Sequence, residues 1–147
     1  MATKNLSSPA RSVSLAGLLG LEEQNTQELI GRIQAGLPFS SFDVFHRASG
    51  ISKPQIASTI VLKPSTMARR KKSGYLSADQ SERLVRLAKV SESAVSLFEG
   101  DVAKAREWME KPRSALGGKT PLEMTATELG AREVENLILR LEDGTFS

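Results

Sequence analysis

The chain has 147 residues, enough for one domain or two very small ones, and at this length about 68–70% of the unfolded surface can be buried. The absence of cysteine excludes disulfides, zinc ribbons and thiol nucleophiles, and the single histidine, His46, excludes a histidine-rich metal site. The net charge of +3 is small but unevenly distributed: residues 44–78 contain no acid, whereas residues 120–147 hold six acids and two arginines, a balance of −4.

Residues 1–24 are expected to form a flexible arm. Residues 1–12 are rich in Ser, Ala and Asn, as in a disordered tail. Residues 13–21 are apolar and follow Lys4 and Arg11, as in a signal peptide, but they lack an Ala-x-Ala cleavage site and run directly into two glutamates. We therefore expect a loosely ordered arm or a short helix at a dimer contact. No run approaches the ~20 apolar residues of a membrane span, so a cytoplasmic protein is expected.

From residue 25 onward, apolar residues recur at helical spacing, and no segment shows the alternation of a strand, so we predict an all-α fold. The first half, residues 25–98, is expected to hold helices over 26–36, 41–48, 53–61, 64–72 and a longest one after Ser77. Ser52 and Ser77 are each followed three residues later by Gln, as in a capping box. The helix after Ser52 is expected to carry Ile56, Ala57, Ile60 and Val61.

The second half, residues 99–147, begins after the long helix. Asp101 is expected to cap a helix over 102–110, and Thr120 a short turn of helix, with a flexible Gly-Gly joint at 117–118 between them. Thr127 is expected to cap the final helix. The apolar stripe of that helix comprises Ala131, Val134, Leu137, Ile138 and Leu141.

Two short helices with a brief turn between them, at about 53–61 and 64–72, have the dimensions of a helix-turn-helix. In that arrangement the first residues of the second helix reach base edges in the major groove. The residues expected at base edges are Ser65, Thr66, Arg69 and Arg70, and those expected at phosphates are Lys63, Lys71 and Lys72. The alternative is a solvated basic helix face that binds no ligand.

The final helix has one apolar residue, Leu139, on the side opposite its stripe. A single exposed leucine needs no explanation. Together with Phe146, however, it would supply two apolar anchors within a polar rim, as in a protein–protein interface. The neighbouring Glu142 and Asp143 make the end of the chain acidic, which would suit a partner with a cationic pocket.

Three C-terminal segments carry a resemblance to a known family. Residues 116–123 read Leu-Gly-Gly-Lys-Thr-Pro-Leu-Glu, residues 127–138 read Thr-Glu-Leu-Gly-Ala-Arg-Glu-Val-Glu-Asn-Leu-Ile, and residues 140–146 read Arg-Leu-Glu-Asp-Gly-Thr-Phe. Together they resemble the toxin-binding domain of Xre/ParS-type antitoxins, which are partnered with RES-domain toxins. Upstream segments at 67–77 and 105–112 also look like that family, so the resemblance covers roughly residues 40–147. Residues 61–65 are less regular than the family's usual turn.

The resemblance implies a small helical antitoxin that neutralises a cognate NAD-destroying toxin and represses its own operon as a homodimer on operator DNA. It also implies that the C-terminal tip enters or covers the active-site cleft of the toxin. The residues carried over to this role are Glu142, Asp143, Gly144, Thr145, Phe146 and Ser147, with Leu139 and Arg140 on the adjoining face. The implied mechanism is occlusion and needs no chemistry from this chain.

Other constellations do not indicate a site. Residues 117–120, Gly-Gly-Lys-Thr, lack the spacing and the preceding strand of a phosphate loop, so a hinge or tight turn is expected there. Paired glutamates occur without a nucleophile or base, and His46 is expected to be packed or half-exposed. We therefore expect no enzymatic activity, no cofactor and no metal. Two other functions remain open: a transcription regulator of phage-repressor type without a toxin, and a helical scaffold with an incidental basic patch.

Overall fold

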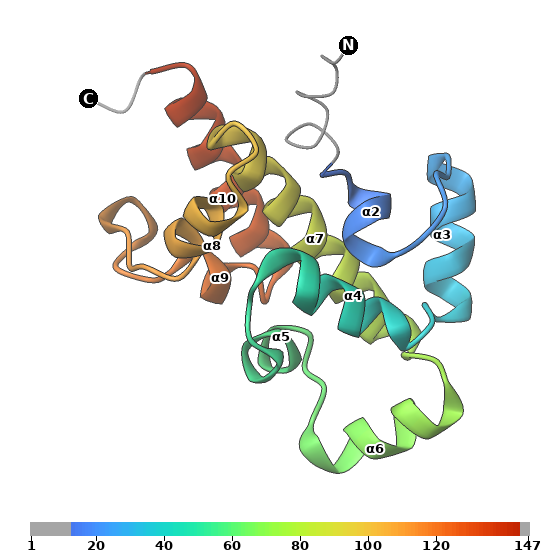
Figure 1. Ribbon diagram of the computed structural model, residues 1–147. Coiled ribbons are helices and arrows are strands. Elements are labelled where there is room, and N and C mark those ends of the chain that lie inside the picture. Colours follow the sequence, from blue (N-terminus) through green and yellow to red (C-terminus); the bar gives the residue numbers. More distant parts are fainter. Residues whose placement is uncertain (1–12, 145–147) are drawn as a thin grey trace.

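The computed structural model describes residues 13–144, which form helices and no strand (Figure 1). The predicted all-α fold is confirmed. Within this part of the chain, no helix combines the length and apolar content that crossing a bilayer requires. The elements are α2 (Leu15–Leu19), α3 (Thr26–Ala35), α4 (Ser40–Ser49), α5 (Lys53–Thr59), α6 (Pro64–Ser73), α7 (Ala78–Leu97), α8 (Val102–Met109), the 3₁₀ helix η1 (Ser114–Leu116), α9 (Pro121–Met124) and α10 (Glu128–Glu142).

Helix α7 forms the centre of the fold. Helices α2, α3, α4, α5, α8 and α10 all contact it, and it runs through the middle of the molecule in Figure 1. A helix that is covered on several sides needs small or apolar residues around most of its circumference. The buried residues of α7 are of this kind, with one glutamine: Gln80, Ser81, Leu84, Val85, Leu87, Ala88, Val90, Ser91, Ala94 and Val95.

The helix starts predicted from the sequence are confirmed by the caps. Ser52, Ser77 and Thr120 each form a reciprocal capping box with the residue three positions on. The side chains of Asp101 and Thr127 accept hydrogen bonds from backbone N–H groups at 3.1 and 3.0 Å. Each such cap contributes about 1 kcal/mol, so these local interactions define where the helices begin.

The segment before α3 is packed against the rest of the fold. In α2, Leu18 and Leu19 are only 2% and 1% exposed. The Ser41 hydroxyl donates to the Leu19 carbonyl at 2.7 Å, and the Leu15 N–H donates to the Glu92 carboxylate at 3.0 Å. Residues 13–24, for which we expected either a loosely ordered arm or a short helix at a dimer contact, include a short helix that contacts α4 and α7 of the same chain. Residues 1–12 lie outside the described part of the chain.

Helix α5 ends at Thr59, earlier than predicted, and the expectation that Val61 continues this helix is wrong. Val61 has a φ of +58° and is 49% exposed. The Leu62 N–H donates to the Ala57 carbonyl at 2.8 Å, and the Leu62 side chain is buried. This left-handed closure, usually made by glycine, turns the chain toward α6. The sequence did not reveal it because a β-branched residue rarely adopts this conformation.

The Gly-Gly segment, for which we expected a flexible joint or a tight turn, is a hydrogen-bonded turn. Gly117 and Gly118 both have positive φ, at +69° and +85°. The N–H of Arg113 donates to the Lys119 carbonyl at 3.0 Å, and the Gly118 N–H donates to the Arg113 carbonyl at 2.9 Å. The Arg113 guanidinium lies over the Trp108 ring, 5.1 Å from its centroid. These contacts hold the connection between α8 and α9 in one conformation.

Candidate functional site

Helix α6 presents all of its basic residues except Arg70 to solvent because it is anchored mainly at its ends. None of its side chains is buried. Before its first turn, the buried Leu62 attaches the chain to the core. After its last turn, the Phe39 N–H donates to the Gly74 carbonyl at 2.8 Å, and the Leu76 N–H donates to the Leu37 carbonyl at 2.9 Å. Figure 1 shows α6 at the edge of the molecule, away from α7.

The residues predicted to contact bases fall on two sides of α6. Ser65 and Arg69 are exposed and, with Lys72, follow the i, i+4, i+7 spacing of one helix face. Thr66 and Arg70 are partly buried, and the Arg70 Nε is enclosed without a hydrogen-bond partner in the described structure. Arg69 and Arg70, which were expected to act together, therefore point in different directions.

The start of α6 has no side-chain cap, unlike the starts of α5 and α7. Lys63 occupies the N-cap position, Pro64 begins the helix, and the first turn contains no acid. The unpaired N–H groups and the helix dipole make such an end attractive to an anion, and Lys63 adds a positive charge. Lys63 and Lys71 are exposed, and neither forms an ion pair with another described residue.

The outer face of α10 is the second exposed surface. Leu139 is 57% exposed, as expected for a residue outside the apolar stripe, but it lies at the edge of the side that faces α7 and not opposite the stripe. Arg140 lies beside it on the surface. Leu129, near the start of α10, is 77% exposed and was not singled out from the sequence. Its position outside the stripe of Ala131, Val134, Leu137 and Ile138 was the available signal. The outer face thus displays two leucines among polar residues.

The C-terminal end of α10 concentrates negative charge. Glu142 and Asp143 are exposed at the helix end, where the unpaired carbonyls already carry a partial negative charge. Gly144, also exposed, has a φ of +73° and closes the helix with a hydrogen bond from its N–H to the Leu141 carbonyl at 3.1 Å. The remaining residues predicted at the tip, Thr145, Phe146 and Ser147, lie outside the described part of the chain.

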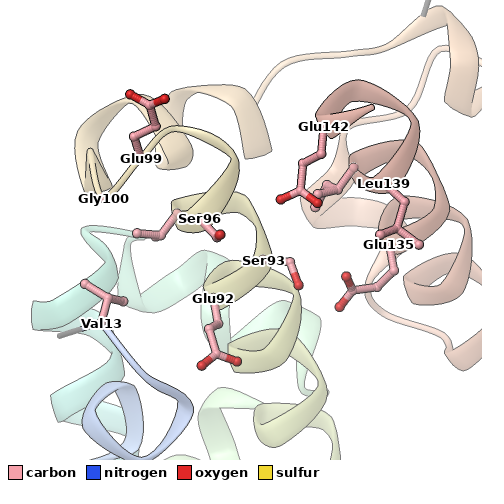
Figure 2. Close-up of a pocket in the computed structure, with 11 residues that line it drawn as sticks. Val13, Glu92, Ser93, Ser96, Glu99, Gly100, Glu135, Leu139 and Glu142 are labelled. Atoms are coloured by element: carbon pink, nitrogen blue, oxygen red, sulfur yellow. The ribbon is translucent and has the colours of Figure 1, made fainter. Parts of the chain in front are cut away.

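A groove of about 610 Å³ runs between α7 and α10 beside this end (Figure 2). We call it the acidic groove; its lining residues are Val13, Glu92, Ser93, Val95, Ser96, Glu99, Gly100, Glu135, Ile138, Leu139 and Glu142. The pKa of Glu135 is raised, first because burial disfavours its charged form and also because Glu92 and Glu142 repel it. A hydrogen bond from Ser93 and the charge of Lys89 oppose this rise. The sequence analysis did not identify this groove.

Arg86 connects the central helix to the segment that carries α10. Its Nε donates to the Thr125 carbonyl at 3.2 Å, and its Nη2 donates to the Ala126 carbonyl at 3.0 Å. Its Nη1 lies 3.8 Å from a carboxylate oxygen of Glu128. The Arg86 side chain is only 14% exposed, so these bonds form in a partly dehydrated environment and position the start of α10 against α7.

No group of three or more His, Asp or Glu side chains within residues 13–144 is arranged to hold a metal ion. The His46 Nδ1 lies 2.7 Å from the Ile51 carbonyl, and the ring is partly buried. The single histidine is therefore engaged in a local contact at the end of α4.

Comparison with known families divides the chain in two. Residues 28–89 match the antitoxin Xre-like helix-turn-helix domain, and residues 93–144 match the antitoxin Xre/MbcA/ParS C-terminal toxin-binding domain. The first match contains α5 and α6, and the second contains α10 and most of the acidic groove. The protein is thus of a class that combines a helix-turn-helix domain with a toxin-binding domain.

Three relatives are each named antitoxin Xre. The protein of Yersinia enterocolitica is 37% identical over 130 residues, and that of Photorhabdus laumondii is 35% identical over 130 residues; both alignments cover 88% of each chain. The protein of Pseudomonas putida is 30% identical over 95 residues, which are 65% of this chain and 59% of the relative. The chain belongs to the Xre antitoxin family.

Proposed function

We propose that this antitoxin neutralises a RES-domain, NAD-degrading toxin by covering the toxin's active site with its C-terminal tip, and that it represses its own operon as a homodimer. The observation that carries the proposal is the end of α10. There Leu139 is exposed beside Glu142 and Asp143, at the negative end of the helix dipole. An apolar anchor next to concentrated negative charge is a surface suited to a cationic, partly apolar partner.

The proposed mechanism is competition for cationic groups. A protein that binds a dinucleotide must present positive charge or N–H donors to its phosphates. Carboxylates at the end of α10 can bind the same groups and so exclude the substrate. Leu139 and Leu129 would contribute apolar contact area outside that cavity, where burial stabilises association without any chemistry by this chain.

The occlusion mechanism is tested by neutralising the tip without changing its shape. The variant Glu142→Gln/Asp143→Asn removes two negative charges from the tip. The matched control Glu22→Gln/Glu23→Gln removes two exposed negative charges near the other end of the sequence. Cells that co-express the toxin should lose NAD with the tip variant and with a chain lacking residues 143–147, but not with the control. If both tip-altered chains still preserve NAD, the globular surface of α10 inhibits the toxin and occlusion by the tip is refuted.

The DNA-binding part of the proposal is supported by the exposed face of α6. Ser65, Arg69 and Lys72 share that face, and the uncapped start of the helix adds N–H donors for a phosphate. A homodimer would present two such helices to half-sites one helical turn apart, about 34 Å.

This part is tested by binding to the promoter fragment of the antitoxin's own operon at fixed salt. Arg69→Ala should relax sequence discrimination by about 1–3 kcal/mol if Arg69 contacts a base. Lys72→Ala should weaken binding uniformly and lower the slope of log K against log salt by about 1. Lys104→Ala on α8 removes an equal charge from another exposed site and serves as control. Equal affinity of all four chains would refute a role for α6.

A further inference from the structure

The acidic groove is lined by apolar residues and by carboxylates, a combination that suits a side chain with an apolar stem and a positively charged end. Val95 and Ile138 are buried at its base, and Leu139 forms an exposed apolar wall. Among the described residues, no lysine or arginine lines it. The charged residues that line it are all carboxylates, contributed by α7, by the turn after α7 and by α10: Glu92, Glu99, Glu135 and Glu142.

Two of these carboxylates are directed into the space between the helices. In Figure 2 the carboxyl groups of Glu135 and Glu142 on α10 turn toward α7. Glu135 is partly buried, and the resulting desolvation, with the charges of Glu92 and Glu142, raises its pKa above the ordinary value. Only Ser93 and Lys89 act in the opposite direction. A further cation in the groove would therefore stabilise the ionised form of Glu135.

We propose that the acidic groove receives an arginine or lysine side chain of the toxin, an inference that rests on the proposed function. Long cationic side chains have an aliphatic stem and a charged head, and they bury the stem along apolar surface while the head stays polar. The stem would lie on Val95, Ile138 and Leu139, and the head would reach Glu135 and Glu92. A small anion or a metal ion would not use the apolar base.

The position of the groove favours the toxin as the source of that side chain. Glu142 lines the groove and also belongs to the C-terminal tip, so a partner that covers the tip comes within reach of the groove. A cavity that binds the phosphates of a dinucleotide carries cationic residues at its mouth. The carboxylates of the groove repel nucleic acid, which excludes DNA as the occupant.

The test separates the groove from the tip by changing two groove residues, Glu92 and Glu135, that are not part of the tip. Glu92→Gln/Glu135→Gln removes two groove charges and keeps the size of both side chains. The Leu15 N–H keeps a partner in this variant, because the amide oxygen introduced at position 92 still accepts its hydrogen bond. The matched control, Glu82→Gln/Glu133→Gln, removes two exposed charges from the same two helices outside the groove. Affinity for the purified RES-domain toxin is measured by titration calorimetry at two salt concentrations.

We expect the groove variant to bind the toxin at least about tenfold more weakly, with a smaller salt dependence, while the control stays within about twofold of the unmodified chain. Unchanged affinity of the groove variant, alongside loss of inhibition by Glu142→Gln/Asp143→Asn, would overturn the groove assignment and leave the proposed function standing. If the unmodified chain does not bind the toxin, both the groove assignment and the proposed function are refuted. A groove variant that instead changes the mass of the free antitoxin in sedimentation would assign the groove to a second copy and overturn the toxin assignment.

Discussion

Replacing Gly130 by alanine should destabilise the toxin-binding half, although alanine is the better helix former. Gly130 lies in the first turn of α10, and its φ is helical, so the conformation itself does not require glycine. The requirement comes from α9. An added Cβ would overlap the carbonyl oxygen of Met124 and lie 2.8 Å from the carbonyl carbon, and both are backbone atoms that cannot rotate away.

The magnitude follows from a comparison with Gly31 in α3. Nothing lies within 4 Å of a Cβ at Gly31, so Gly31→Ala should gain about 0.5–1 kcal/mol of unfolding free energy. At Gly130 alanine brings the same gain in helix propensity, but the added Cβ overpacks against a rigid backbone. We take the cost of this overpacking as about 3 kcal/mol, the upper end of the range usual for overpacked cores. The expected net loss is about 2 kcal/mol, and the two alanine variants should differ by about 3 kcal/mol.

The assay is urea unfolding followed by far-UV circular dichroism, with the free energy of unfolding extrapolated to water. Because α9 must move away from α10, Gly130→Ala should also weaken toxin binding, whereas Gly31→Ala should leave it unchanged. A Gly130→Ala variant as stable as the unmodified chain would refute the reasoning, since it would mean that α9 can shift at no cost.

Three further changes test other parts of the structure. Arg86→Met should cost about 2–3 kcal/mol in the same unfolding assay, because it leaves the carbonyls of Thr125 and Ala126 without their charged donor; a loss below 0.5 kcal/mol, taken as roughly the size of a surface substitution, would contradict this. Val61→Asn should stabilise the chain by about 1 kcal/mol, because asparagine tolerates the left-handed backbone at φ +58° better than valine does; a less stable variant would mean that the valine side chain contributes more than the strain costs. Glu135→Gln should be more stable than the unmodified chain at neutral pH. Because the pKa of Glu135 is raised in the folded chain, its charged form lowers the free energy of unfolding above that pKa, and this loss disappears as the pH falls below it. The difference in unfolding free energy between the two chains should therefore shrink toward zero in acid. A difference that stays constant across pH would contradict the assignment.

The parts of the fold that could be predicted from the sequence depend on short-range interactions. Ser52, Ser77, Thr120 and Thr127 each cap a helix through a backbone N–H group three residues away, so their effect can be recognised within a short stretch of sequence. The apolar stripe of α10 could also be predicted from local sequence, since helical periodicity alone identifies the four of its members that are buried. Exposure of Leu139 followed from the same periodicity.

The parts that could not be predicted depend on distant or unusual contacts. Helix α2 has only five residues, and its start is held by Glu92, 77 residues away from Leu15. The acidic groove exists because Glu92 and Glu135 come together when α7 and α10 pack, which no local pattern reveals. Val61 adopts a conformation that its residue type disfavours, so propensity pointed to the wrong structure.

The boundary between the two family matches has a mechanical consequence. The helix-turn-helix match ends at residue 89 and the toxin-binding match begins at residue 93, and both positions lie inside α7. A continuous helix whose residues are buried on both sides of that division offers no hinge there. Arg86, within the first match, also holds Thr125 and Ala126 of the second. A toxin bound to α10 would therefore move as one body with α7 and with the helices that pack against α7.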